Sequence, residues 1–159
     1  MINQRLSNQR SVHAITHFKG AHSWLSNYYQ SPIVIEGILY PSGEHAFNAQ
    51  KTTDPRIRGV IAAAKTSAEA KSIGRSVNLI DGWDEYRRYD AMILVQGTKF
   101  APGTLLAGWL VGLGDTILIE GNQWHDNTWG VCYCGQCKNG HNLFGWILMR
   151  QRSFLRGLG

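Results

Sequence analysis

Residues 32–52 read PIVIEGILYPSGEHAFNAQKT, and this stretch decides the fold class. Two β-rich runs, 32–35 and 38–40, are separated by Glu36-Gly37, which has the turn chemistry of a tight hairpin. Pro41-Ser42 then ends the second run, and Ser42 is a good N-cap for a helix over 43–52. A hairpin that leads directly into a helix predicts a fold that mixes both kinds of structure.

Helix signals continue along the rest of the chain. Asp54-Pro55 predicts a helix from 55 to about 65, and Thr66 begins a capping box that predicts a helix over 67–75. We expect Asp81 to cap a longer helix over 83–100, Pro102 to begin one that ends near 113, and a last helix to run from 142 or 143 to about 156. A short strand is expected over 116–120. These patterns predict an α+β domain, mainly helical, with about six helices and a small β-sheet.

Length and composition indicate one folded domain. A chain of 159 residues, 43% of them hydrophobic, is long enough for one core and too short for two full domains. We expect a flexible polar arm over 1–14 and a single domain over 15–159. The arm contains no apolar segment typical of a signal peptide, and no run approaches the roughly 18 apolar residues of a membrane span. Three cysteines between 132 and 137 do not form a disulfide framework, so a reducing, cytoplasmic setting is the simplest interpretation.

The charge pattern favours an anionic partner. Only 17% of the residues are charged, yet the net charge is +5, and the chain has 18 Gly and 6 Trp. A small basic protein that is rich in aromatic side chains suits nucleotides, phosphosugars or nucleic acid.

Polar side chains of the 43–52 helix form the first candidate site. Glu44, Asn48 and Lys51 stand at i, i+4 and i+7 and are expected to share one face. Glu44 lies in the first turn, where the helix dipole favours a negative charge. These side chains could hold one substrate between them, or they could form an ordinary solvated face.

A Gly/Asn/Trp-rich segment over 121–142 is the second candidate, because loops of this length in small domains are often functional. Trp124 and Trp129 could stack on a base or sugar, and Asp126 could bind sugar hydroxyls or activate water. In the alternative interpretation, Trp129 fills the core and Asp126 caps a turn. Residues 25–29 offer Ser26, Asn27 and Tyr28, which suit phosphate or ribose or else form an ordinary turn.

Cys132, Cys134, Cys137 and His141 lie within ten residues and could close a tetrahedral Cys3His zinc site. Such a site would be structural, because all four ligands would come from the protein. The alternative is a set of ordinary thiols.

Several motifs in a fixed order connect these pieces. They are Leu25-Ser26-Asn27-Tyr28-Tyr29, Tyr40-Pro41-Ser42-Gly43-Glu44-His45 with Lys51, Gly74-Arg75, Trp83 with Met92, Lys99-Phe100, Gly114-Asp115, Leu118 with Glu120, Asn122 with Asp126, Trp129-Gly130 and Asn142-Leu143-Phe144-Gly145. Over about residues 17–155 the chain therefore resembles the NADAR (YbiA-like) family of N-glycosidases.

The resemblance implies a mainly helical fold with a small sheet and a hydrolase that cleaves a ribosyl C1′–N bond. It implies two substrate groups: ADP-ribose attached to guanine, and phosphoribosyl aminopyrimidine intermediates of riboflavin synthesis. The basic charge favours the first, with DNA that carries modified guanine as a candidate partner. A non-catalytic module that binds ADP-ribose or nucleic acid is the alternative from another class.

By motif match, the catalytic candidates are Glu44, Lys51, Asp126 and Trp129. Lys51 would neutralise a phosphate or attack C1′ as an amine. The substrate-binding candidates are Ser26, Asn27, Tyr28, Asn48, Trp124, Gly130 and Asn142. No cofactor is expected to be required, because the cysteine cluster occurs in only part of the family.

Overall fold

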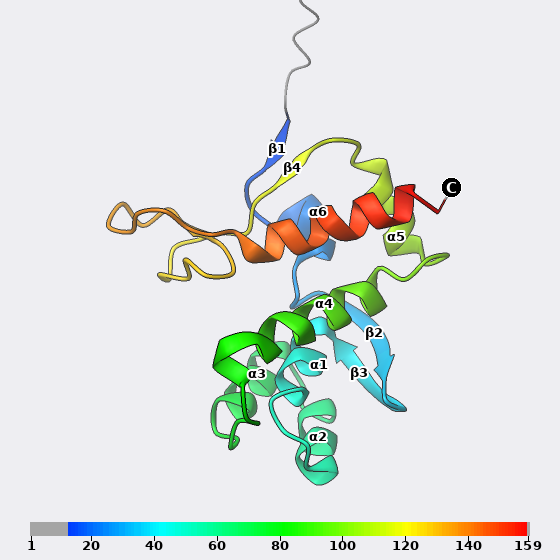
Figure 1. The fold of residues 1–159 in the computed structure, drawn as a ribbon, viewed down its shortest axis with the longest axis vertical. Helices are drawn as coiled ribbons and strands as arrows, with labels where there is room; N and C mark the ends of the chain where they lie inside the picture. Colours follow the sequence, from blue (N-terminus) through cyan, green and yellow to red (C-terminus); the bar gives the residue numbers. More distant parts are fainter. Residues whose placement is uncertain (1–12, 159) are drawn as a thin grey trace, which may run out of the picture.

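The structure is a computed structural model that describes residues 13–158, so most of the arm expected over 1–14 lies outside the described residues. Ala14 already belongs to β1 (Ala14–Ile15), which pairs in parallel with β4 (Ile117–Leu118). β4 in turn contacts α6 (Leu143–Arg156), so the two ends of the described chain lie in one part of the molecule (Figure 1).

The expected hairpin is present as β2 (Gln30–Ile35) and β3 (Ile38–Ser42). The turn residues Glu36 and Gly37 both have positive φ, 51° and 78°, as a tight hairpin turn requires. Ile33, Ile35 and Tyr40 point into the core, and this places the start of the following helix against the same core.

Three helices begin at the caps that the sequence predicts. The side chains of Ser42, Asp54 and Thr66 accept backbone N–H groups at the starts of α1 (Gly43–Ala49), α2 (Pro55–Ala62) and α3 (Ser67–Arg75). The first of these helices ends at Ala49, so Lys51 follows the helix rather than lying on its last turn.

The helical segment expected from residue 83 begins there, but its predicted cap was wrong, and so was the predicted start of the helix after it. Gly82, with φ of 74°, occupies the cap position instead of Asp81, and a π-helical turn η2 (Trp83–Arg87) precedes α4 (Arg88–Lys99). α5 (Leu105–Gly112) begins after Thr104, whose hydroxyl accepts the N–H of Ala107, and Pro102 lies in the preceding turn.

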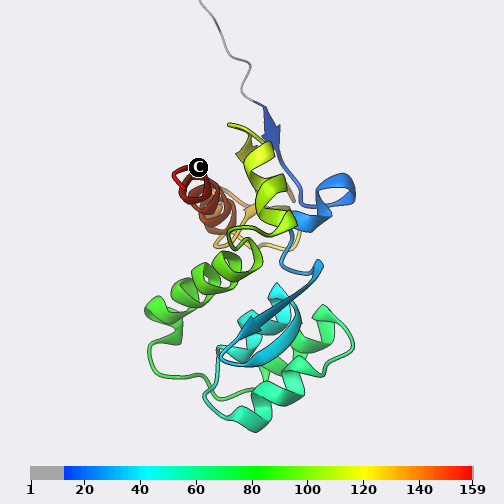
Figure 2. The same cartoon turned by 90° about the vertical axis from the view of Figure 1, so that its right-hand side faces the viewer.

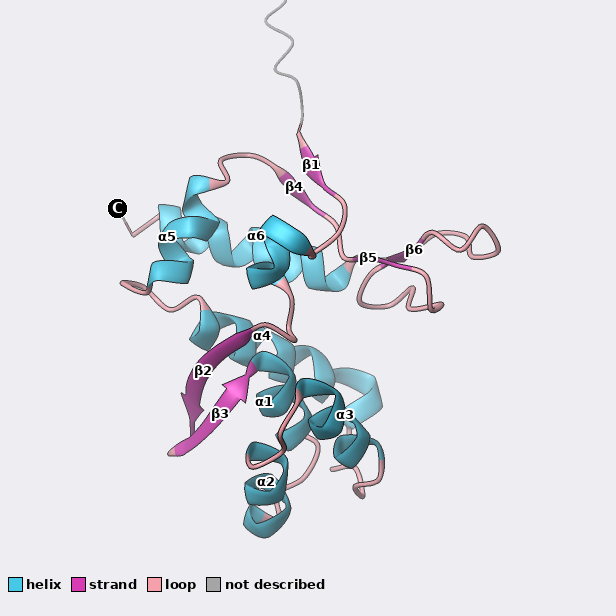
Figure 3. Ribbon diagram, turned by 180° about the vertical axis from the view of Figure 1, so that it is seen from behind, coloured by secondary structure: helices cyan, strands magenta, loops and turns pink. Residues whose placement is uncertain are grey.

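The expected single sheet is instead three separate two-stranded pairs in the described residues. The third pair, β5 (Gly121–Asn122) with β6 (Val131–Cys132), lies at the base of the loop over residues 121–142, which projects from the molecule (Figure 3). A 3-10 helix, η1 (Gly20–Leu25), was not among the predicted elements. Within the described part, no helix combines the length and apolar character needed to span a bilayer.

Two hydrophobic cores lie on either side of α4. One is built around η1, α5 and α6, and the other around the hairpin and α1 to α3 (Figures 1 and 2). α4 belongs to both, because Met92 is part of the first core and Val95 of the second. Phe47 of α1 also packs against both cores, and a large cavity opens beside it.

Candidate active site

A cleft of about 1000 Å³ brings together segments that are far apart in the sequence. Its walls come from residues 26–28, α1, α3, the start of α4 and the 121–142 loop. Most of the predicted site residues line it: Ser26, Asn27, Tyr28, Glu44, Asn48, Lys51, Trp124, Asp126 and Trp129.

Glu44 is a buried carboxylate in the first turn of α1, and its two oxygens are held by two amides. Oε2 accepts a hydrogen bond from Nδ2 of Asn27 at 2.8 Å, and Oε1 accepts one from Nδ2 of Asn48 at 3.1 Å. Asn27 is itself fixed, because its Oδ1 accepts Nε2 of Gln96 at 2.9 Å. Nζ of Lys71 lies 3.9 Å from Oε1. The carboxylate is therefore oriented before any ligand arrives.

Two glycines make room for this network. A Cβ on Gly43 would collide with Oδ1 of Asn27, and a Cβ on Gly74 would collide with the side chain of Asn48. Both amides that hold Glu44 therefore depend on the absence of a side chain on a neighbouring element.

Lys51 lines the cleft just beyond the end of α1, and its Nζ donates to the carbonyl of Gly74 at 3.1 Å. Burial lowers the pKa of Lys51, and the cations Lys71 and Arg75 lower it further, while Glu44 opposes them. A larger fraction of this lysine is therefore a neutral amine than at an exposed position.

Asp126 lines the cleft and also organises its own loop. Its Oδ1 accepts the backbone N–H groups of Thr128 at 3.1 Å and Trp129 at 2.9 Å. The Asn122 side chain binds the backbone N–H and carbonyl of Asp126. Asp126 therefore does cap a turn, as the alternative interpretation expected, through Oδ1. The residue also lines the cleft.

Aromatic rings form one wall of the cleft. Trp129 packs edge-to-face on Phe47, with centroids 5.7 Å apart and an interplanar angle of 85°. Phe47 in turn contacts the buried Trp83 at 5.4 Å. Among the tryptophans that line the cleft, Trp124 is the exposed one, at 58%, and its ring is open for stacking.

Glu120 is a lining residue that our site prediction missed. Burial raises its pKa to about 7, and Asp126 adds to the shift. The residue belongs to the Leu118/Glu120 motif of the resemblance, so the signal was present, but only its tertiary surroundings single it out. Lys99, whose pKa burial lowers to about 7, lies nearby and donates to the carbonyl of Ser26 at 2.7 Å.

The cleft contains more cations than the one, Lys51, that was placed among the predicted site residues. Along with Lys51, the lining includes Lys19, Lys71, Arg75 and Arg88. Nζ of Lys71 lies 5.5 Å from the centroid of the Tyr28 ring, which adds a cation–π contact. Five basic side chains against the carboxylates of Glu44, Glu120 and Asp126 make the cleft suitable for a phosphate-bearing ligand.

Gly130 and Asn142 do not line the cleft, although both were predicted to bind substrate. Asn142 Oδ1 accepts the N–H of Glu120 at 2.9 Å, and its Nδ2 donates to the carbonyl of Leu118 at 2.8 Å. A Cβ on Gly130 would collide with the carbonyl of Glu120. Both residues therefore support the backbone around Glu120.

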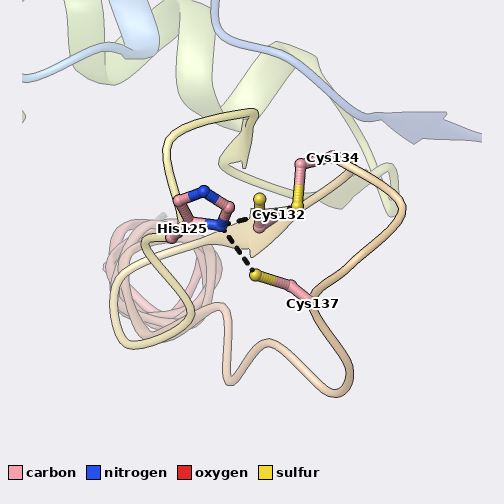
Figure 4. A group of neighbouring side chains, drawn as sticks. All are labelled: His125, Cys132, Cys134 and Cys137. Atoms are coloured by element: carbon pink, nitrogen blue, oxygen red, sulfur yellow. Dashed lines mark hydrogen bonds between the residues drawn. The ribbon is translucent and has the colours of Figure 1, made fainter.

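The cysteine cluster forms with a different histidine from the one predicted. Possible ligand atoms of His125, Cys132, Cys134 and Cys137 all lie within 4.8 Å of one another (Figure 4). His125 has a φ of 66°, which turns the chain so that its ring faces the cysteines. His141 does not join this group, and its N–H donates to the carbonyl of Asn127 at 2.8 Å.

Comparisons with known proteins agree with the fold. Residues 15–156 match the family described as the NADAR domain. The chain is 34% identical over 136 residues to a riboflavin biosynthesis protein of Vibrio vulnificus, and spans 36% of that protein's length. It is 30% identical over 132 residues to the N-glycosidase YbiA of Escherichia coli, and the matched region covers 82% of this chain and 79% of that protein. The NMR structure of E. coli YbiA superposes with a TM-score of 0.77 and 26% sequence identity, over 94% of this chain and 92% of that chain. The mainly helical α+β fold is thereby confirmed.

Proposed function

This chain belongs to the NADAR family, and from that premise we propose that it is a hydrolase that cleaves a ribosyl C1′–N bond. The E. coli relative is named an N-glycosidase, which supports the reaction class. The observation that carries the proposal is the meeting of Glu44, Lys51 and Asp126 in one cleft beside aromatic rings. A cleft with these groups offers charge stabilisation, a nucleophile or base, and a surface for a leaving base.

The substrate we propose is ADP-ribose attached to guanine, free or in DNA. Its two phosphates, two riboses and two bases need a large cleft, and the volume of about 1000 Å³ supports this choice. Ordinary small-molecule pockets measure about 300–1000 Å³. The five basic side chains of the lining suit a pyrophosphate.

Phosphoribosyl aminopyrimidine is the second candidate substrate, and one observation favours it. The relative from V. vulnificus is named a riboflavin biosynthesis protein. This compound carries a single phosphate and fills less of the cleft. The two candidates therefore differ in how many of the basic side chains they engage.

The chemistry begins with weakening of the C1′–N bond. As this bond breaks, positive charge develops on the ribose, and the fixed carboxylate of Glu44 stabilises it. Asp126 orients the ribose hydroxyls and shares the role of base toward water. The water oxygen bonds to C1′, and its proton passes to a carboxylate.

Glu120 supplies the proton that the leaving nitrogen needs. With a pKa of about 7, its carboxyl group is largely protonated in weakly acidic solution. The electron pair of the C1′–N bond moves to the nitrogen of the base, which takes the proton from Glu120. Trp124 stacks on the departing base.

Lys51 provides a covalent route to the same products. The lone pair of its neutral amine attacks C1′, the electron pair of the C1′–N bond leaves with the base, and the base takes a proton from Glu120. The cationic amine of the adduct gives a proton to the ring oxygen, and the ring opens to a Schiff base that water hydrolyses to the free sugar and the lysine amine. The lowered pKa of Lys51 supports this role over simple phosphate neutralisation. Borohydride added during turnover should trap a covalent adduct on Lys51, detectable by mass spectrometry of the peptide. No adduct with either substrate would show that the lysine acts only through its charge.

A side-by-side hydrolysis assay tests the function. Purified protein is incubated with DNA carrying ADP-ribosylated guanine and, separately, with phosphoribosyl aminopyrimidine, and released ADP-ribose or ribose 5-phosphate is measured by mass spectrometry. We expect Glu44→Gln to lower turnover by at least about a hundredfold. Glu85→Gln, an exposed position outside the cleft, is the matched control and should retain full activity. Tight binding without product release from either substrate would favour the non-catalytic module and refute the enzyme.

A further inference from the structure

We propose that His125, Cys132, Cys134 and Cys137 bind one zinc ion, and that this ion holds the loop segment that carries Asp126. The proposal concerns a site outside the cleft, and its main test does not depend on the function proposed above. None of the four residues lines the cleft.

The geometry of the four side chains suits a tetrahedral ion. In a zinc site with Zn–S near 2.3 Å and Zn–N near 2.0 Å, neighbouring ligand atoms lie about 3.5–3.8 Å apart. Here Nδ1 of His125 lies 3.2 Å from Sγ of Cys137 and 3.5 Å from Sγ of Cys134. No pair of ligand atoms in the group is further apart than 4.8 Å. Side-chain movements of about 1 Å would therefore bring all four onto one ion.

The chemistry of the donors selects the metal. Three thiols and one imidazole are soft and borderline ligands, which favour zinc over magnesium or calcium. All three cysteines are free thiols, so no disulfide competes for the sulfur atoms. Four protein ligands leave no position for water, so the ion would be structural rather than catalytic.

The part of the loop that carries Cys134 and Cys137 has no regular secondary structure, because the described backbone between residues 133 and 140 forms no helix or strand. The N–H of Gln136 points to Sγ of Cys134 at 3.4 Å, the kind of N–H···S contact that also orients zinc-bound thiolates. A metal that joins this turn to His125 would therefore add a connection between two arms of the loop. The β5–β6 pair and the hydrogen bond from the N–H of His141 to the carbonyl of Asn127 already join these arms elsewhere.

The ion would act on the cleft through the loop. His125 directly precedes Asp126, and Oδ1 of the next residue, Asn127, accepts the N–H of Cys132 at 3.3 Å. Both backbone neighbours of Asp126 are thus connected to the cluster. Asp126 itself, and Trp124 on the other side of His125, line the cleft.

Metal analysis of the full-length protein tests the site. The protein is purified without chelator, and we expect about one zinc per chain by elemental mass spectrometry. Replacement by Co²⁺ should give the visible bands of a tetrahedral ion together with thiolate-to-cobalt charge transfer. The three thiols should react slowly with a thiol reagent until a chelator is added.

Matched variants then separate the two histidines. His125→Asn should lower the zinc affinity at least tenfold, whereas His141→Asn, a change of the same kind in the same loop, should leave it unchanged. Cys134→Ser should weaken the thiolate-to-cobalt bands, because one of the three thiolate ligands is lost, and it should lower the zinc affinity. If a variant does not fold, the thiol and cobalt measurements on the unaltered protein still decide the question.

Three results would overturn the proposal: a zinc content far below one per chain after incubation with zinc, thiols that react equally fast with and without chelator, or metal loss in His141→Asn but not in His125→Asn. Where zinc binds, its removal should also lower the melting temperature, by roughly 10 °C when free zinc is a thousandfold above Kd.

Discussion

Replacing Glu120 by glutamine should make the protein more stable, and the gain should depend on pH. The folded-state pKa of this carboxyl is about 7, against an ordinary value of 4.5. Because the folded state binds the proton more tightly than the unfolded chain, the contribution to stability is greatest below pH 4.5. It is lost as the pH rises through 7, since the buried group must then carry a charge.

The size of the effect follows from the shift in pKa. A shift of roughly 2.5 pKa units at about 1.4 kcal/mol each corresponds to about 3 kcal/mol between pH 4.5 and pH 8. This value is an upper limit, because glutamine also removes an attraction for neighbouring cations. The charged groups that act on Glu120 are Asp126 and Glu44, which raise its pKa, and Lys99 and Lys19, which lower it.

Urea denaturation at pH 5, 6, 7 and 8 measures this difference directly. The free energy of unfolding of Glu120→Gln minus that of the unaltered protein should rise with pH, whereas Glu85→Gln should show no trend. A difference that stays constant over this range would refute the reasoning. In the hydrolysis assay, kcat/KM of the unaltered protein should fall as the pH rises through about 7. Glu120→Gln should have an activity at least about a hundredfold lower, and its activity should no longer fall over this pH range.

Two further substitutions test the network around Glu44. Asn27→Ala should destabilise the protein by about 1–3 kcal/mol, because Glu44 and Gln96 each lose a buried partner, and it should lower kcat more than it raises KM. Urea denaturation and steady-state kinetics measure the two effects, and an unchanged kcat would contradict the orienting role. Gly74→Ala should cost about 1–3 kcal/mol, because the new methyl group displaces Asn48. The matched change Gly59→Ala, where a Cβ meets nothing within 4 Å, should cost nothing or stabilise α2.

Local chemistry was sufficient to predict much of the fold. Ser42, Asp54 and Thr66 cap helices in the structure as the sequence predicts, because capping depends on residues only two or three positions away. The prediction for Asp81 was wrong, because Gly82 next to it adopts a left-handed backbone and occupies the cap position. The pairing of β1 with β4 joins residues about a hundred positions apart and has no local signal.

The same division holds for the candidate site. Glu44, Lys51 and Asp126 were identified from motifs and do line one cleft. The importance of Glu120 comes from burial beside Asp126, which only the folded chain shows. His141 was chosen for its spacing from the cysteines, whereas the histidine that meets them, His125, is brought there by a turn of the loop.

The membership of α4 in both hydrophobic cores has a consequence for how the molecule unfolds and binds. If one core unfolded, either Met92 or Val95 of α4 would lose its packing partners, and the helix would be destabilised for the other core as well. The two halves of the molecule, one around each core, should therefore not be stable independently. Despite the cleft between them, the halves should melt in a single cooperative transition. For the same reason we expect α4 to hold the helices on its two sides at a fixed distance, without a hinge between them. A ligand should then be selected by its fit between these helices rather than by their closure around it.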